Sequence, residues 1–173
     1  MKKIVSVLSA GFTCLLISCN GKKEGGMSDA AKKNLDASHI VSDAFMSGDA
    51  SKIDDAVAAD FVDHTDRGDM GRDSLKAMIG MMKKEAPDMK MKLSKEVADD
   101  DYVFSAMEFT GTSNGQMGMP KGPYDLHAIQ MIKFKDGKAV EHWEYMRNDD
   151  MMKMMPPPPM DNKMDSTKKM GNK

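Results

Sequence analysis

Apolar residues recur at the spacing of an α-helix in three segments of the first half of the chain. The first segment, residues 30–47, carries Leu35, Val41 and Phe45 on its apolar face and is followed by Gly48. A shorter segment of the same kind covers residues 51–59. The third covers residues 72–85 and is followed by Pro87, which cannot continue a helix. The pattern therefore predicts three helices before Pro87.

After Pro87 the spacing of apolar residues changes from helical to alternating. Met89, Met91 and Leu93 alternate with polar residues, which is typical of a half-exposed strand. We predict further strands over 61–64, 102–112, 125–134 and 138–147. Asp136-Gly137 separates the last two and indicates a tight hairpin, because glycine adopts the positive φ that such turns need.

The order of these elements predicts the fold class. Helices come first and a meander of strands ends the domain, so the class is α+β, with N-terminal helices packed on one face of a curved antiparallel sheet. The domain is expected over residues 30–148. Residues 149–173 are rich in Met, Lys, Asp and Pro but hold no aromatic or β-branched apolar residue. We expect this Met/Pro-rich tail to be disordered.

The N-terminus has the layout of an export signal. Lys2 and Lys3 precede an apolar run that is too short to span a bilayer, and Leu16-Ile17-Ser18-Cys19 resembles a bacterial lipobox. We therefore expect residues 1–18 to be a lipoprotein signal peptide that is removed. Cys19 would then carry lipid, and residues 19–29 would tether the domain to a membrane. An ordinary secretory signal, with Cys19 an incidental thiol, is the alternative.

Asn20 follows the expected lipidation site. In some Gram-negative bacteria an aspartate at this position retains a lipoprotein in the inner membrane. Asparagine there favours an exported protein anchored to the outer membrane.

The charge balance argues against a nucleic-acid partner. The 173 residues carry 25 basic and 27 acidic side chains, a net charge of −2, without a basic stripe. We expect no cofactor. His64, Asp66 and His127 could together form a carboxylate–histidine metal site, but the short histidine spacings typical of such sites do not occur. We therefore predict no metal.

Five short segments, taken in order, resemble the SnoaL-like polyketide cyclase family of the nuclear transport factor 2-like superfamily. They are Phe61-Val62-Asp63-His64, the helix 72–85 with Ala86-Pro87-Asp88, Gly111-Thr112-x-x-Gly115, Phe134-Lys135-Asp136-Gly137-Lys138 and Glu141-His142-Trp143. The resemblance implies a cone-shaped α+β fold. It also implies a conical pocket between helices and sheet that suits a small apolar molecule.

Family members include metal-free cyclases and isomerases that remove a proton beside a carbonyl, and others that hydrolyse epoxides. This chemistry needs a base and a donor for the developing enolate oxygen. The family's acid/base carboxylate comes from the last strand, so we select Glu144 as the base, with Glu141 as its competitor. Burial beside Trp143 would raise the pKa of a carboxyl there.

His127 and His64 are expected to orient or polarise the substrate. Trp143, Asp66 and Glu141 are expected to contact it. Which face of the last strand lines the pocket stays open, since Glu141, Trp143 and Tyr145 share one face while His142, Glu144 and Met146 share the other. Glu144 could equally be a solvent-facing glutamate in a charged strand.

Two other classes of function remain. The superfamily often pairs its sheets into homodimers, so the chain could be a non-catalytic binding or scaffold lipoprotein of the same fold. The methionine-rich tail could alternatively bind Cu(I) or absorb oxidants.

Overall fold

Helix α1 (Asp29–Ser47) begins and ends close to where the sequence predicts. The computed structural model describes residues 26–155. The Ser28 hydroxyl accepts a hydrogen bond of 3.0 Å from the backbone N–H of Ala31 and so caps the first turn. At the other end Gly48 has φ +80° and donates its N–H to the Ala44 carbonyl. This left-handed position ends the helix, as glycine allows.

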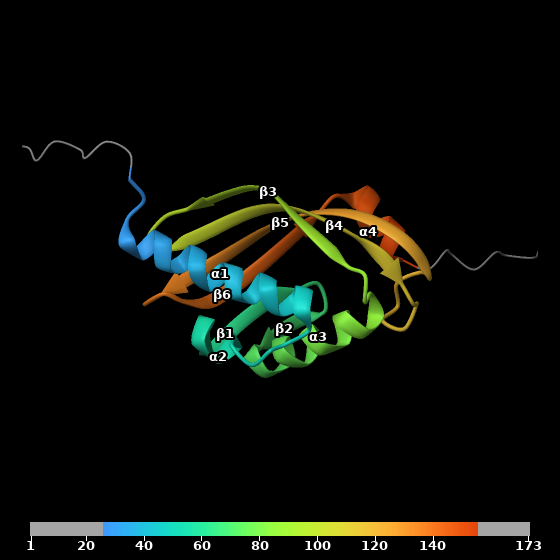
Figure 1. The fold of residues 1–173 in the computed structure, drawn as a ribbon, viewed down its shortest axis with the longest axis horizontal. Helices are drawn as coiled ribbons and strands as arrows, with labels where there is room; N and C mark the ends of the chain where they lie inside the picture. Colours follow the sequence, from blue (N-terminus) through green and yellow to red (C-terminus); the bar gives the residue numbers. More distant parts are fainter. Residues whose placement is uncertain (1–25, 156–173) are drawn as a thin grey trace, which may run out of the picture.

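Six strands form one curved sheet (Figure 1). They are β1 (Val57–Thr65), β2 (Gly68–Gly71), β3 (Lys90–Ala98), β4 (Tyr102–Ser113), β5 (Gly122–Lys135) and β6 (Lys138–Met146). Their order across the sheet is β2-β1-β6-β5-β4-β3. The meander β3 to β6 is antiparallel, as predicted. β1, however, pairs with β6 in parallel, so the sheet is mixed rather than wholly antiparallel.

The hairpin between β5 and β6 confirms the turn predicted at Asp136-Gly137. Lys135 pairs with Lys138 across a two-residue loop. Asp136 has φ +55° and Gly137 φ +77°, so both central residues adopt the left-handed conformation that twists with the flanking strands.

The second predicted helix is much shorter than expected. Helix α2 covers only Ile53–Ala56, and Val57 already belongs to β1, where it pairs with Ala139 of β6. The prediction of a helix through Ala59 is therefore wrong. The β-branched Val57 pairs in the sheet, and this pairing outweighs a helical pattern that is too short to fix residues 57–59 as helix.

Helices α1, α2 and α3 (Arg72–Glu85) cover one face of the sheet, and the core lies between these helices and the sheet. α1 and α3 lie together on that side (Figure 1). Ile53, Ile79, Val103 and Ile132 are almost wholly buried there. This confirms the α+β architecture with helices packed on a curved sheet.

The sequence did not predict a helix after the last strand. α4 (Asn148–Met154) follows β6 and packs on β5, where the disordered tail was expected to begin. The buried carboxylate of Asp150 holds it: Arg147 Nε lies 2.9 Å and Lys153 Nζ 2.6 Å from its oxygens. The predicted signal peptide, Cys19 and the tail beyond Met155 lie outside the described residues. Within residues 26–155 no helix has the length and apolar character needed to cross a membrane.

Candidate functional site

The sheet has an inner face, which α1 and α3 cover, and an outer face, which points away from them. Val103, Ile132 and Phe134 belong to the core and so mark the inner face. Ile132 pairs directly with His142 of β6. Because paired residues point to the same side of a sheet, His142 and Glu144 share the inner face, while Glu141 and Trp143 share the outer one.

A polar row crosses the inner face of four strands. Glu96 pairs with Ser105, Ser105 with Gln130, and Gln130 with Glu144, so the four side chains follow one another across the sheet. The buried Ser105 hydroxyl donates a 2.9 Å hydrogen bond to Glu96, whose other oxygen lies 2.8 Å from His39 of α1. These four consecutive polar positions interrupt the otherwise apolar inner face and make the row the candidate site.

A carboxylate–imidazole pair lies at the β6 end of this row. Asp63 of β1 pairs with His142 across the parallel ladder, and its Oδ1 lies 2.7 Å from His142 Nδ1. Asp63 is only 5% exposed. Since a carboxylate can only accept, Nδ1 carries the proton and Nε2 is the ring atom left for a ligand.

Glu144 combines two properties of a candidate base. Its side chain is exposed to solvent. At the same time the surrounding protein raises the pKa of its carboxyl through desolvation, and the nearby Asp63 raises it further, whereas His142 lowers it. Trp143 was expected to cause this shift, but its side chain lies on the opposite face of β6.

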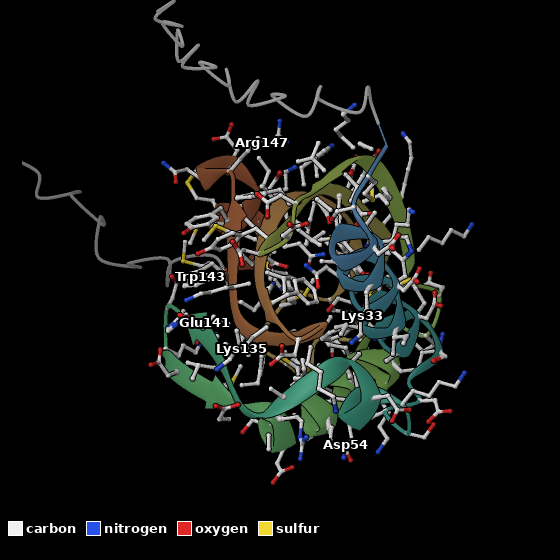
Figure 2. The ribbon with its side chains drawn as sticks, turned by 90° about the vertical axis from the view of Figure 1, so that its left-hand side faces the viewer. Lys33, Asp54, Lys135, Glu141, Trp143 and Arg147 are labelled. Atoms are coloured by element: carbon white, nitrogen blue, oxygen red, sulfur yellow. The ribbon has the colours of Figure 1, made fainter. Side chains whose placement is uncertain are left out.

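His64, Glu141 and Trp143 lie together on the outer face. The imidazole of His64 stacks on Trp143 with ring centroids 4.8 Å apart. Glu141 binds Lys133 at 2.7 Å and His64 Nε2 at 3.3 Å. Figure 2 shows Glu141 and Trp143 on the side of β6 turned away from α1.

These contacts set the charge states on the outer face. A hydrogen bond to Asp69 raises the pKa of His64, with Glu141 contributing, and the Lys133 hydrogen bond lowers the pKa of Glu141. Each shift favours the charged form of its group, so His64 and Glu141 stabilise each other's charge.

The remaining predicted residues lie away from Glu144. His127 is on the outer face of β5, opposite Glu108 of β4. Asp66 is exposed in the turn between β1 and β2. The structure thus brings His64 and Glu141 together, but it places neither these two nor His127 on the face that carries Glu144.

Two residues of the inner face, Asp63 and His142, were not selected from the sequence. Both occur in the segments that carry the family resemblance. His142 was also placed on the same strand face as Glu144. Their pairing depends on the parallel contact between β1 and β6, which the residue pattern does not reveal.

Two hollows occur at the ends of α1. The larger, of about 470 Å³, lies between Gly26–Ala31 and the turn 98–101. The smaller, of about 170 Å³, lies beside the C-terminal end of α1. Neither is lined by Glu144 or His142.

A profile of the SnoaL-like polyketide cyclase family matches residues 36–155, which include the whole sheet. The chain belongs to this family. No curated protein sequence matches it at a significant level.

Solved structures of SnoaL-like proteins share the fold. One assigned as a SnoaL-like polyketide cyclase from Jannaschia sp. CCS1 superposes with a TM-score of 0.66 at 15% identity, over 78% of this chain and 99% of that one. IdmH of Streptomyces antibioticus, assigned as a polyketide cyclase, gives 0.57 at 24% identity, over 69% and 95%. A protein from Bacillus cereus ATCC 10987 with the same assignment gives 0.58 at 25%, over 70% and 79%. The SnoaL-like fold is thus shown, but not its reaction.

Proposed function

We propose that this SnoaL-like protein binds a small, largely apolar molecule against the inner face of its sheet and catalyses acid–base chemistry there. The observation that carries the proposal is the carboxyl of Glu144, whose pKa is raised, two residues from a histidine that Asp63 holds. Apolar residues flank this polar centre along the strands, with Ile132 and Val103 on one side and Met107 and Ala128 on the other. All four are buried, and an apolar environment of this kind suits a flat ketone, lactone or epoxide.

In the proposed reaction the Glu144 carboxylate removes a proton from a carbon next to a substrate carbonyl. The electrons of that C–H bond move to the carbonyl oxygen, and the Nε2–H of protonated His142 donates a hydrogen bond to it. Asp63 balances the charge of the imidazolium. The enolate carbon then closes the ring on a second carbonyl carbon, and Glu144 returns its proton to the oxygen formed there.

His142 takes the role that sequence reasoning gave to His127 and His64. Those two histidines lie on the outer face, where a substrate bound beside Glu144 does not reach them. Trp143 and Glu141 are left out of the proposed substrate contacts for the same reason, and Asp66 is left out because it lies in the exposed turn between β1 and β2. Ser105 and Gln130 take their place, because they continue the polar row from Glu144.

A ligand search on the purified protein tests this function. Native mass spectrometry detects molecules that copurify, and thermal shift against ketones, lactones and epoxides finds others. We expect Glu144→Gln to abolish turnover of a hit while its binding persists, and we expect Glu141→Gln, the matched outer-face variant, to keep both. Unchanged turnover in Glu144→Gln would remove this residue from the mechanism.

A non-catalytic assembly is the second candidate function, and the outer face favours it. Phe104, Ile129 and Tyr145 are all exposed there on adjacent strands. A homodimer through this face, or a scaffold built on it, would leave the inner face free. A ligand recovered unchanged and unaffected by Glu144→Gln would favour this alternative.

We further propose that Cys19 anchors the protein by lipid to the outer membrane, after removal of residues 1–18. The proposal rests on the lipobox-like tetrad and on Asn20. Cys19→Ser should abolish incorporation of labelled palmitate in a bacterial host. Equal labelling of the variant and the original chain would refute the anchor.

A further inference from the structure

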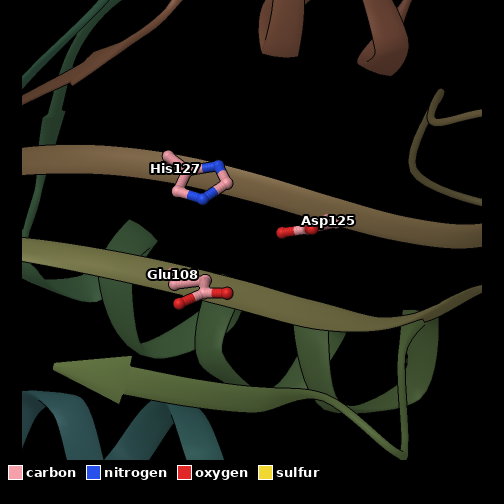
Figure 3. Close-up of side chains that lie close together, drawn as sticks. All are labelled: Glu108, Asp125 and His127. Carbon is pink, nitrogen blue, oxygen red and sulfur yellow. The ribbon is translucent and has the colours of Figure 1, made fainter. Parts of the chain in front are cut away.

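The geometry points to a divalent metal site on the outer face, formed by Glu108, Asp125 and His127. Glu108 and His127 are direct partners across β4 and β5, and Asp125 precedes His127 by two residues on the same face. One ligand atom from each lies within 4.8 Å of the other two. Figure 3 shows the three side chains close together on neighbouring strands.

The donor set fits a borderline ion such as Zn²⁺. One imidazole nitrogen and two carboxylate oxygens supply three protein ligands, which leaves a fourth position for water. Two ligand atoms on a tetrahedral zinc ion lie about 3.4 Å apart, so the carboxylates need to move by only about 1 Å. Asp125 is exposed and Glu108 is half-buried, and the paired strands β4 and β5 hold their backbone positions.

A buried carboxylate behind His127 is the second observation. Asp150 of α4 is 0% exposed, and its Oδ2 lies 3.4 Å from His127 Nδ1. Arg147 Nη2 lies 3.3 Å from the same nitrogen. Both contacts are made by Nδ1, so Nε2 has neither of these partners. Because a guanidinium can only donate, metal binding through Nε2 requires the tautomer in which Nδ1–H points to Asp150. Metal-binding histidines commonly have such a carboxylate on their far nitrogen, because it fixes the ring and accepts its proton.

Lys92 competes with the proposed ion. Its Nζ lies 2.9 Å from Oε2 of Glu108 and balances that charge when no metal is bound. A divalent ion would take over this neutralisation and release the lysine. The site therefore predicts that removing the Lys92 charge raises metal affinity, whereas removing His127 abolishes it.

Titration of Zn²⁺ into the full chain, purified in detergent, tests the site by calorimetry. We expect one ion per chain, no detectable binding at this site in His127→Gln, and a several-fold gain in affinity in Lys92→Gln. His39→Gln is the matched control, because His39 also pairs with a carboxylate, Glu96, but has no third ligand in the described residues. It should leave the affinity unchanged.

The histidine ring provides a readout that does not depend on binding heat. Zinc should shift the Nε2 resonance of His127 in nitrogen-detected spectra, and the resonances of His39 and His64 should stay in place. Absence of zinc binding, or binding that is equal in His127→Gln and the original chain, would overturn the proposal. Loss of binding in His39→Gln alone would place the ion elsewhere and overturn it too.

Discussion

At the residue scale, two glutamates three positions apart on β6 have opposite environments. Glu144 lies on the inner face, where desolvation raises the pKa of its carboxyl. Glu141 lies on the outer face, where hydrogen bonds from Lys133 and His64 lower the pKa of its carboxyl. The alternation of side chains along a strand thus separates a candidate base from a charge that only forms ion pairs.

This difference predicts opposite pH dependences of stability. The raised pKa means that Glu144 keeps its proton to a higher pH in the folded protein than in the unfolded chain. Raising the pH above 4.5, the ordinary pKa of this carboxyl, therefore lowers the free energy of unfolding of the original chain. Glu144→Gln should therefore gain stability relative to the original chain as pH rises from 4.5 through the raised value. Urea midpoints measured at several pH values give the difference.

Glu141→Gln is the control with the opposite sign. Its lowered pKa means that the ionised carboxyl stabilises the folded state above its ordinary value of 4.5, and that this contribution disappears as pH falls through the folded value. The variant should therefore lose stability relative to the original chain as pH rises. Parallel pH curves for the two variants would contradict the assignment of the two faces.

At the scale of the elements, one buried carboxylate joins α3 to the loop after β4. Glu85 is 1% exposed at the last position of the helix. Its oxygens accept hydrogen bonds from the Ser113 hydroxyl at 2.6 Å and from the backbone N–H groups of Gly115, Gln116 and Met117. Desolvation opposes its charge, but these donors outweigh it and keep the pKa of Glu85 below its usual value.

Glu85→Gln should destabilise the protein by about 2 kcal/mol, because it replaces hydrogen bonds to a charged acceptor with weaker ones and presents an amide to backbone donors. Hydrogen exchange at residues 115–117 should accelerate, while exchange in the β5–β6 hairpin should follow global unfolding alone. The lowered pKa makes the charge stabilising above the usual carboxyl range, so the variant and the original chain should converge in acid. Unchanged exchange at these three amides would show that Glu85 does not hold the loop.

The extent to which the sequence predicts this molecule also varies by element. Long segments of one period, such as residues 72–85 and 102–112, match α3 and β4 closely. The hairpin at Asp136-Gly137 follows from local backbone preferences. The prediction around Val57 is wrong. The four residues of α2 are too few to show a helical period, and the residues after them form a strand because they pair in the sheet.

The candidate site was harder to predict than the fold. Glu144 could be selected from its strand and the family resemblance, but its face depends on register. Asp63 and His142 meet through the parallel β1–β6 pair, a contact between residues 79 positions apart. No local pattern encodes such a contact, and it is also what separates His64 from the inner face.

At the scale of the whole molecule, the two faces of the sheet offer separate surfaces. On the outer face Phe104, Met131 and Trp143 form one row across three strands, and Ala106, Ile129 and Tyr145 form the next. Phe104, Ile129 and Tyr145 are 40%, 54% and 57% exposed. A contiguous apolar surface of this kind, bordered by the pairs Lys133–Glu141 and Lys92–Glu108, is typical of a protein interface.

We therefore expect a homodimer through the outer face. Ile129→Lys would bury an unpaired charge at the centre of this contact, at a cost of about 1.4 kcal/mol or more. The dimer dissociation constant should therefore rise tenfold or more. Sedimentation equilibrium measures the change. Met81→Lys, at a methionine that is 48% exposed on α3, is the matched control and should leave the dimer intact. Both variants should keep any ligand bound beside Glu144, since the inner face is unaltered. A monomer for the original chain well above micromolar concentration would contradict the interface and leave the inner face as the molecule's functional surface.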